Sequence, residues 1–267
     1  MSAAASHISI RGVDKVFASG GQEVHALQAI DLEIARGEFV CLLGPSGCGK
    51  STLLNAVAGF SLPTAGTITV DGSPITAPGP DRGMVFQEYA LFPWMTVEQN
   101  VAFGLQIKGT AKAAIEAMVS ELLLMLNLQD FRKRYPKDLS GGMRQRVAIA
   151  RVLALDSPIM LMDEPFGALD ALTRRNLQDE VLRLWMELKK TVLFVTHSIE
   201  EALYLADRTV VMTYRPGTLK RDIQVDLPRP RDVASPEFNL LKKELSQLLM
   251  EEQSRHNQAE FRGAAVD

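Results

Sequence analysis

The feature of this sequence that most constrains its fold is a glycine-rich octapeptide, Gly44-Pro45-Ser46-Gly47-Cys48-Gly49-Lys50-Ser51, which fits the pattern G-x-x-x-x-G-K-[ST]. It lies between an apolar run at 39–43, which suits a buried strand, and a helical stretch at 52–59. The glycines let successive backbone N–H groups face inward, and the helix N-terminus adds a positive field at the same place. We therefore predict a phosphate-binding loop, in which Lys50 reaches the β- and γ-phosphates and the Ser51 hydroxyl ligates Mg²⁺. The alternative is a flexible glycine turn, which the strand–loop–helix context disfavours.

Composition excludes several classes of protein. The chain has 267 residues, of which 46% are hydrophobic, and a formal net charge of −3, which suits one α/β domain and disfavours nucleic acid as a partner. Cys41 and Cys48 form no C-x-x-C pair, so we expect neither a disulfide nor a zinc site, and a reducing cytoplasm fits. The N-terminus does not read as a signal peptide, and the apolar runs are shorter than the ~20 residues that a bilayer requires. Any membrane role is therefore expected to come through a partner.

Two adjacent carboxylates, Asp163 and Glu164, follow a second apolar run at 159–162. Ligands of open α/β sheets bind at the carboxyl ends of strands, and a strand sends successive side chains to opposite faces. The two carboxylates are therefore expected to differ in role. Asp163 would hold Mg²⁺ or its water shell, and Glu164 would polarise the attacking water. The alternative is a solvated strand end.

The order of predicted elements indicates an α/β fold. Residues 7–17 and 24–34 alternate between apolar and polar positions, as strands of a partly exposed antiparallel sheet do. Buried strands are expected at 39–43, 84–86, 159–162 and 192–195. Helices between these strands, such as 173–190, imply a mostly parallel sheet. We therefore predict a P-loop NTPase core with an N-terminal antiparallel β subdomain and an inserted α-helical subdomain at about 88–155.

The stretch Leu139-Ser140-Gly141-Gly142-Met143-Arg144-Gln145-Arg146 leads into a helical run at 147–155. Ser140 can cap that helix, and the glycines leave its N-terminus open as a second anion site. This octamer resembles the signature of ABC-type (ATP-binding-cassette) ATPases, because it lies between a phosphate loop and an Asp-Glu pair in that family's order. The resemblance covers about residues 7–230, and 231–267 is expected to form a C-terminal amphipathic helix and tail.

The resemblance implies roles for further residues. Gln87 corresponds to the glutamine that links the metal to the helical subdomain, and His197 to the histidine that touches the γ-phosphate. Asp170, at the end of 167–170, belongs to the loop that contacts a partner subunit, and Phe17 takes the place of the aromatic residue that stacks on adenine. For each of these side chains the alternative is an ordinary structural or surface role. The residues expected to bind nucleotide are Phe17, Gly44, Pro45, Ser46, Gly47, Cys48, Gly49, Lys50, Ser51, Thr52, Ser140, Gly141, Gly142 and Asp170.

The resemblance also implies partners. Ser140 and Gly142 of one subunit would close over ATP held by the phosphate loop of another, so a homodimer with ATP and Mg²⁺ between its subunits is expected. Glu164, His197 and Gln87 would be the catalytic residues, and Ser51, Gln87 and Asp163 the metal ligands. The dimer would serve two transmembrane permease subunits, and indirectly a solute-binding protein, at the cytoplasmic face of the inner membrane.

Short motifs indicate the branch of the family. The stretches at 79–82, 91–94 and 228–232 are similar to those of subunits that serve nitrate, taurine and alkanesulfonate importers. Phe92 and Trp94 are expected to line a groove for a helix of the membrane partner, with core packing as the alternative. The last helix, at about 237–252, is expected to pack on its own domain, with a regulatory or dimerising role as the alternative. A soluble ABC-type ATPase not coupled to transport, a subunit for another small solute and a non-hydrolysing switch remain as alternatives.

Overall fold

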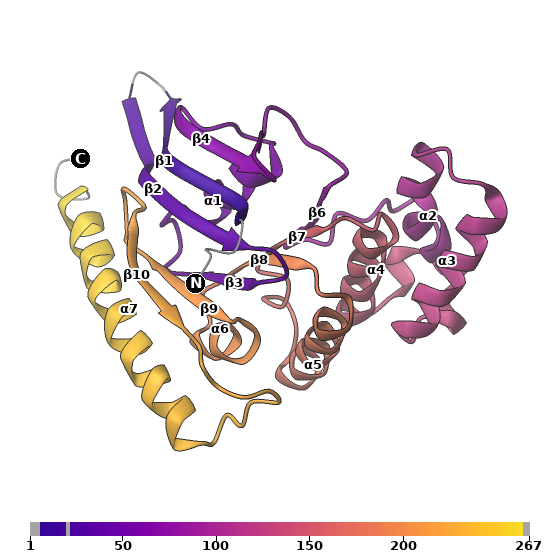
Figure 1. Ribbon diagram of the computed structural model, residues 1–267. Coiled ribbons are helices and arrows are strands. Elements are labelled where there is room, and N and C mark those ends of the chain that lie inside the picture. The colour runs from indigo at the N-terminus through magenta and orange to yellow at the C-terminus, as the bar shows by residue number, and fades with distance from the viewer. Residues whose placement is uncertain (1–5, 20–21, 264–267) are drawn as a thin grey trace. The chain divides into compact units, whose positions relative to one another are not determined.

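The computed structural model describes residues 6–19 and 22–263, and its elements fall into two compact units (Figure 1). One unit contains the described residues up to Pro78 together with those from Thr191 onward. The other unit is Gly79–Lys190. The helical subdomain expected at about 88–155 lies inside the second unit, and Gly20 and Gly21 lie outside the described residues.

The first unit contains an antiparallel sheet in the order β2-β1-β4-β5. Its two long strands are β1 (Ser6–Ser19) and β2 (Gln22–Ala35), and the shorter ones are β4 (Ala65–Val70) and β5 (Ser73–Pro74). Alternating side chains of β1 are fully buried, namely Ile8 and Ile10, while Ser9 and Arg11 make exposed hydrogen bonds. This alternation is that of a sheet with one solvated face, as the sequence predicts.

Four further strands of the first unit follow the order β10-β9-β3-β8. The strands β3 (Phe39–Leu43), β8 (Thr191–Thr196) and β9 (Arg208–Met212) are parallel, and β10 (Leu219–Gln224) runs antiparallel to β9 at the edge. Every residue of β3 and β8 is buried. Parallel strands buried in this way read in the sequence as continuous apolar runs, which is how β3 could be predicted.

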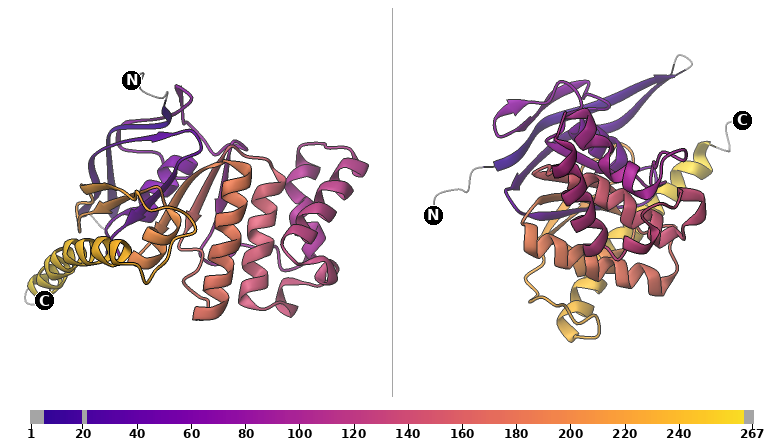
Figure 2. Two further views of the ribbon diagram at one scale, coloured as in Figure 1. Left: turned by 60° about the horizontal axis from the view of Figure 1, so that its bottom comes forward. Right: turned by 90° about the vertical axis from the view of Figure 1, so that its right-hand side faces the viewer.

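Three helices of the first unit complete its core. The helix α1 (Lys50–Ala58) follows β3 and packs on β8, while α6 (Ile199–Leu205) packs on β3 and β8. The long helix α7 (Pro236–Gly263) packs against α6 and β9. In the left view of Figure 2 it is the yellow helix beside the orange segments. Phe238 and Leu245 on its inner face are fully buried. The prediction that this helix packs on its own domain is confirmed, but α7 is longer than the predicted 237–252.

The second unit has a two-stranded parallel pair flanked by long helices. The strands are β6 (Arg82–Val85) and β7 (Ile159–Asp163). The helix α4 (Gly141–Ala154) packs against β6 and against α5 (Ala171–Leu188). Most of the second half of α4 is buried, from Val147 to Ala154 with Arg151 only partly so, which makes it the central helix of this unit.

The remainder of the second unit is helical. The helices α2 (Val97–Ile107) and α3 (Lys112–Met125) are followed by two short 3₁₀ turns, η1 (Gln129–Phe131) and η2 (Pro136–Asp138). The helix α2 begins at a capping box. The Thr96 hydroxyl accepts the backbone N–H of Gln99, and the Gln99 side chain accepts the backbone N–H of Thr96. It packs on α4 and α3. Among residues 6–19 and 22–263, no helix combines the length and the apolar character needed to cross a bilayer.

Candidate functional site

The phosphate loop connects β3 to α1 through two residues in the left-handed region. Gly47 has φ 75° and Gly49 has φ 99°, conformations that side chains other than glycine rarely adopt. The Lys50 side chain is only 5% exposed, and its ammonium donates hydrogen bonds to the carbonyl oxygens of Gly44 at 2.8 Å and Pro45 at 2.9 Å. The loop therefore curls around its own lysine and holds a buried positive charge at the start of α1.

The N-terminus of α1 fits an anion of the phosphate class. Its N-cap residue is Gly49, which has no side chain to satisfy the N–H groups of the first turn. These N–H groups and the Lys50 ammonium converge at one helix end, where the helix dipole adds a positive potential. Ser46 and Ser51 are exposed and Thr52 is partly exposed, so the loop presents hydroxyl groups beside the N–H donors.

Cys48 packs inside the phosphate loop. Its side chain is fully buried, and a methyl group at Gly44 would lie 2.7 Å from its sulfur. Burial raises the pKa of the Cys48 thiol, although the ammonium of Lys50 acts in the opposite direction. Cys48 is therefore a neutral packing residue that keeps its part of the loop close to Gly44.

His197 lies next to the phosphate loop in the first unit. It follows β8, is exposed, and lines a cavity of ≈ 390 Å³ together with the first part of the loop. The wall of the cavity comes from α6 and α7. The lining residues are Gly44, Pro45, Ser46, His197, Ile199, Ser246, Leu249, Met250 and Gln253. The sequence-predicted histidine and phosphate loop are thus brought together on one surface.

Phe17 lies on β1 with 43% of its surface exposed. Its ring is covered in part by the ammonium of Lys15, 5.1 Å from the ring centroid. The ring is therefore an accessible π-surface rather than part of the sheet core, as a base-stacking residue requires.

The carboxylate pair is at the end of β7 in the second unit. Asp163 is the last residue of the strand, and both it and Glu164 are partly exposed. Glu164 has φ 41°, a left-handed conformation that is uncommon for a residue with a side chain and that clusters at functional sites. This turn sends the chain away from the strand direction immediately after Asp163, which gives the two carboxylates different environments.

The signature stretch begins α4, and Ser140 caps that helix as predicted. The Ser140 hydroxyl oxygen accepts from the N–H of Met143 at 3.3 Å. A methyl group at Gly141 would lie 3.3 Å from the Tyr89 hydroxyl, and one at Gly142 would lie 2.6 Å from the γ-methyl of Thr173. The absence of side chains at Gly141 and Gly142 thus allows the segment that contains Tyr89 and the first turn of α5 to approach the start of α4 closely.

Those two segments carry other predicted residues. Asp170 is the N-cap of α5, and its carboxylate accepts the backbone N–H of Thr173 at 3.0 Å. This hydrogen bond holds the pKa of Asp170 below its ordinary value. Gln87 is exposed two residues before Tyr89, whose ring lies 5.4 Å from the guanidinium carbon of Arg144 in the signature.

Arg151 was not singled out from the sequence, yet it fixes the segment after Gln87. Its guanidinium donates to the carbonyl oxygens of Tyr89 at 3.1 Å and Ala90 at 2.6 Å. Tyr89 and Ala90 both have positive φ, so this segment needs such an external constraint. Burial lowers the pKa of Arg151. The sequence offered only an arginine within a predicted helix, which is ordinarily a surface residue.

Of the two aromatic side chains predicted to line a groove, one is accessible. Trp94 is 70% exposed, and its ring lies 5.7 Å from that of Phe92. The Phe92 ring packs inward on Phe103 at 4.6 Å. Phe92 therefore supports Trp94, which presents its surface to solvent.

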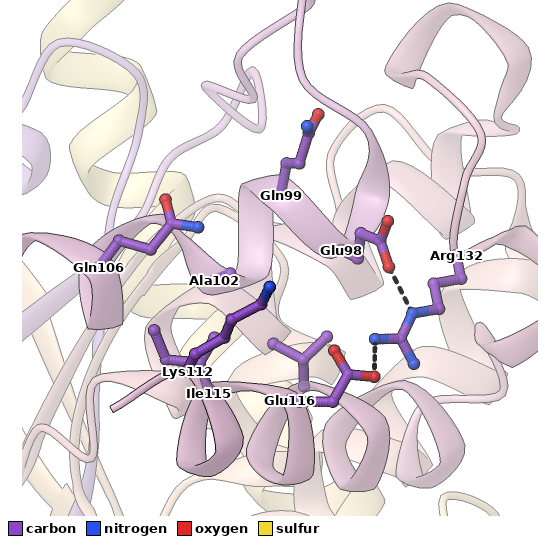
Figure 3. A pocket seen from close by; sticks show the side chains of 9 residues that line it. Glu98, Gln99, Ala102, Gln106, Lys112, Ile115, Glu116 and Arg132 are labelled. Atoms are coloured by element: carbon purple, nitrogen blue, oxygen red, sulfur yellow. Dashed lines mark hydrogen bonds and ion pairs between the residues drawn. The ribbon is translucent and has the colours of Figure 1, made fainter. Parts of the chain in front are cut away.

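A separate groove of ≈ 230 Å³ runs between α2 and α3. Figure 3 shows the guanidinium of Arg132 between the carboxylates of Glu98 on α2 and Glu116 on α3, to which it donates hydrogen bonds. The hydrogen bond to Glu98 contributes most to raising the pKa of Arg132. This network ties the two helices together and fixes the walls of the groove.

The comparisons with known proteins agree with this geometry. The chain matches the ABC transporter family over residues 27–167. It is 50% identical over 245 residues to an uncharacterised ABC transporter ATP-binding protein of Methanocaldococcus jannaschii, with 92% of each chain covered. It is 44% identical to a nitrate import ATP-binding protein of a Synechocystis species, covering 95% of this chain and 98% of the relative. It is 49% identical to a taurine import ATP-binding protein of Roseobacter denitrificans, covering 87% and 90%.

A solved structure has the same fold. The dimeric post-hydrolysis structure of an ATP-binding cassette bound to ADP and Pi superposes with a TM-score of 0.73 at 34% identity, covering 82% of this chain and 98% of that one. This chain therefore belongs to the ABC transporter family, and within that family it is an ATP-hydrolysing cassette.

Proposed function

We propose that ATP hydrolysis by this chain drives the import of a small anionic solute. The observation that carries the ATP-binding part is the phosphate loop, in which a buried lysine and an uncapped helix N-terminus converge. A buried ammonium beside open N–H donors is poised to bind a polyphosphate anion, which would complete its charge compensation.

In this proposal the residues of the first unit bind the nucleotide. Lys50 and the backbone N–H groups of residues 46–52 hold the phosphates, and the Phe17 ring stacks on the base. The Ser51 hydroxyl would be the ligand of Mg²⁺ in this unit, and the bound metal would supply positive charge to the phosphates. His197 is proposed to donate a hydrogen bond to the terminal phosphate, and its position on the ≈ 390 Å³ cavity beside the loop supports this role.

The residues of the second unit complete the chemistry. Glu164 accepts a proton from the attacking water, and the left-handed turn at this residue supports a role distinct from that of Asp163. Asp163 and Gln87 contribute to holding the metal and its water shell. Ser140, Gly141 and Gly142 offer a second helix N-terminus for the γ-phosphate of ATP bound to another copy of the chain.

We further propose that the chain acts as a homodimer bound to two permease subunits at the cytoplasmic face of the membrane. The related cassette was solved as a dimer, which supports this assembly. Trp94 is proposed as a contact for the permease, because its ring is exposed while Phe92 anchors it. Asp170, which caps α5, is proposed to lie at the contact between the two copies.

The class of solute rests on the relatives. Proteins named for nitrate import, taurine import and aliphatic sulfonate import are 44–49% identical to this chain, and the three solutes are small and carry an anionic group. The chain itself would not select among them, since its site binds ATP alone.

The hydrolytic role is tested by Glu164→Gln, which keeps the shape of the side chain but cannot accept the proton. We expect hydrolysis to fall by at least about 100-fold while ATP binding persists and the dimer accumulates. Glu187→Gln is the matched control, because Glu187 is an exposed carboxylate of α5 in the same unit. Hydrolysis at the wild-type rate in the Glu164→Gln variant would disprove the assignment of the base.

The import role is tested in a strain that lacks the gene. We expect a growth defect with taurine, an alkanesulfonate or nitrate as the only source of sulfur or nitrogen, and normal growth on sulfate with ammonium. The wild type and Glu187→Gln should restore growth, and Glu164→Gln should not. Normal growth of the deletion strain on all these solutes would contradict import of this class.

The permease contact is tested by Trp94→Ala in the assembled transporter. We expect weaker co-purification of the permease and an unchanged rate of hydrolysis in the isolated cassette. Leu124→Ala is the control, since Leu124 is also an exposed apolar side chain of the second unit, with 65% of its surface exposed. Equal retention of the permease by both variants would remove Trp94 from the interface.

A further inference from the structure

The connection between β9 and β10, residues 213–218, is closed by hydrogen bonds between its two ends. The backbone N–H of Thr213 donates to the carbonyl of Thr218 at 3.0 Å, and the N–H of Thr218 donates to the Thr213 hydroxyl at 2.9 Å. That hydroxyl in turn donates to the carbonyl of Pro216 at 2.9 Å. Because the 213–218 loop is bonded to itself in this way, a displacement on one side of it is transmitted to the other.

One side of the 213–218 loop touches the phosphate loop. Arg215 donates a hydrogen bond from Nε to the carbonyl oxygen of Gly47 at 3.2 Å. Gly217 approaches so closely that a methyl group there would lie 2.2 Å from the carbonyl oxygen of Cys48. The backbone of Gly217 is itself fixed, since its N–H donates to the carbonyl of Ala26 at 3.0 Å.

The other side of the 213–218 loop is held by α7. The carboxylate of Glu252 is fully buried, and its Oε2 accepts the backbone N–H of Tyr214 at 2.9 Å. Its Oε1 accepts from the ammonium of Lys220 at 2.7 Å. The Tyr214 ring also meets the His256 ring edge-on, with the centroids 4.3 Å apart. Tyr214 is thus attached to α7 by its backbone and by its side chain.

The Arg215 contact has a direct consequence for anion binding. In a trans peptide the C=O and the following N–H point in opposite directions. A Gly47 carbonyl held by Arg215 therefore directs the N–H of Cys48 away from Arg215. The phosphate loop binds anions only while its successive N–H groups converge, and Gly47, with φ 75°, has no side chain that would resist a rotation of this peptide.

We propose that Arg215 is a positioning residue for the phosphate loop, and that Glu252 holds Arg215 in place, so that the C-terminal helix tunes nucleotide affinity. This inference rests on the proposed role of the phosphate loop in binding ATP. The helix also borders the loop a second time, because Ser246, Leu249 and Met250 of α7 line the ≈ 390 Å³ cavity beside Gly44. The neighbours of Glu252 on α7, Glu251 and Gln253, are exposed, so the buried carboxylate marks one specific contact.

The test compares the ATP dependence of hydrolysis in purified full-length variants. Arg215→Met removes the donor to Gly47 and keeps most of the side-chain length. We expect the KM for ATP to rise by about tenfold, equivalent to about 1.4 kcal/mol, while kcat stays within about twofold. Arg215→Lys, which keeps a donor on a flexible stem, should recover part of the loss.

Glu252→Gln tests the link through the helix. A glutamine presents an NH₂ group either to the N–H of Tyr214 or to Lys220 and Arg255, all of which are donors, so at least one hydrogen bond is lost. We expect the KM for ATP to rise by about threefold. The Arg215→Met/Glu252→Gln double variant should have the same KM as Arg215→Met alone. Glu251→Gln is the control, because Glu251 also binds Lys220 but is 62% exposed and makes no contact with Tyr214 that the structure records.

Arg215 is exposed, so Arg215→Met is expected to fold, which circular dichroism at the assay temperature verifies. If Arg215→Met hydrolyses ATP with an unchanged KM, the positioning role is overturned while the proposed ATPase function stands. If its KM rises and that of Glu252→Gln does not, the link to α7 is overturned. A wild-type chain that hydrolyses no ATP would contradict the proposed function, and the direct affinity for a fluorescent ATP analogue then decides the inference separately.

Discussion

Replacing Arg231 should show how strongly one buried guanidinium stabilises the first unit. Arg231 is 4% exposed and donates to four backbone carbonyls. Two of these, Leu203 and Ala206, belong to the C-terminal end of α6, and the others are Val225 and Leu227 of the segment after β10. Burial lowers the pKa of Arg231 to about 10, so the group is still charged at neutral pH.

The magnitude follows from two opposing effects. Arg231→Met leaves buried carbonyl oxygens without their donor, at about 1–3 kcal/mol each. It also removes the desolvation cost of a buried charge, which is several kcal/mol. We expect a net loss of about 3 kcal/mol in the free energy of unfolding, or a Tm lower by about 6–12 °C for a chain of this size. Arg231→Lys has one ammonium in place of the planar guanidinium. Its free energy of unfolding should lie between those of Arg231→Met and the wild type.

The assay is urea and thermal unfolding followed by circular dichroism, with Arg229→Met as the control. Arg229 binds Asp207 at 2.6 Å and the carbonyl of Leu205 at 2.6 Å, but Asp207 retains a second bond from the N–H of Phe39. Arg229→Met should lower the free energy of unfolding by about 1 kcal/mol. If Arg231→Met is no less stable than Arg229→Met, the carbonyl cluster around Arg231 does not contribute as argued.

Three further outcomes are expected. Gly66→Ala should lose about 3 kcal/mol or more in the free energy of unfolding, because Gly66 has φ 80° and the new methyl group would lie 2.2 Å from the carbonyl oxygen of Gly12. Gly72 also has a positive φ, 77°, but a methyl group there meets open space, so Gly72→Ala should lose only about 1 kcal/mol. Equal losses in the two variants would refute the steric argument. Burial would raise the pKa of Glu252, but hydrogen bonds from Lys220 and Tyr214 hold it below the ordinary 4.5, so the unfolded chain takes up the proton first as the pH falls. The stability advantage of the wild type over Glu252→Gln should therefore be full above pH 4.5 and disappear as the pH falls through the folded pKa; an advantage that persisted at the acid end would contradict this sign. Burial raises the pKa values of the Cys41 and Cys48 thiols, so neither should react with a thiol reagent at pH 8 until the chain is unfolded, and rapid labelling of either thiol in the native protein would contradict this.

The parts of the fold that could be predicted are those where buried elements leave a simple pattern. The apolar run at 39–43 coincides with β3, and the run at 159–162 lies within β7. Backbone groups that bind phosphate demand glycine and lysine at fixed spacing, so the phosphate loop is visible in the sequence itself. The cap formed by Ser140 could be predicted for the same reason, since only a few side chains can fill that position.

Other parts leave no such pattern. The strand β10 was not predicted, because its charged residues at 220–222 suit a solvated edge and hide the alternation. The last part of α7 was missed because residues 251–256 carry no apolar side chain, and polar and ring contacts, among them those of Glu252 and His256, hold it in place. Arg215 gave no signal, since its partner is a backbone carbonyl about 170 residues earlier, and no spacing rule covers such a pair. The roles of Gln87, His197 and Asp170 stay predictions.

The strand β10 also affects how the protein behaves at high concentration. Its partner β9 is almost entirely buried, with Val210, Val211 and Met212 at 0% exposure, and such a strand would recruit foreign chains if its edge were bare. The edge that faces solvent instead belongs to β10, which carries Lys220, Arg221 and Asp222 in succession. Charges on an edge strand discourage sheet-to-sheet pairing, so β10 protects the edge of this sheet against pairing with strands of other chains.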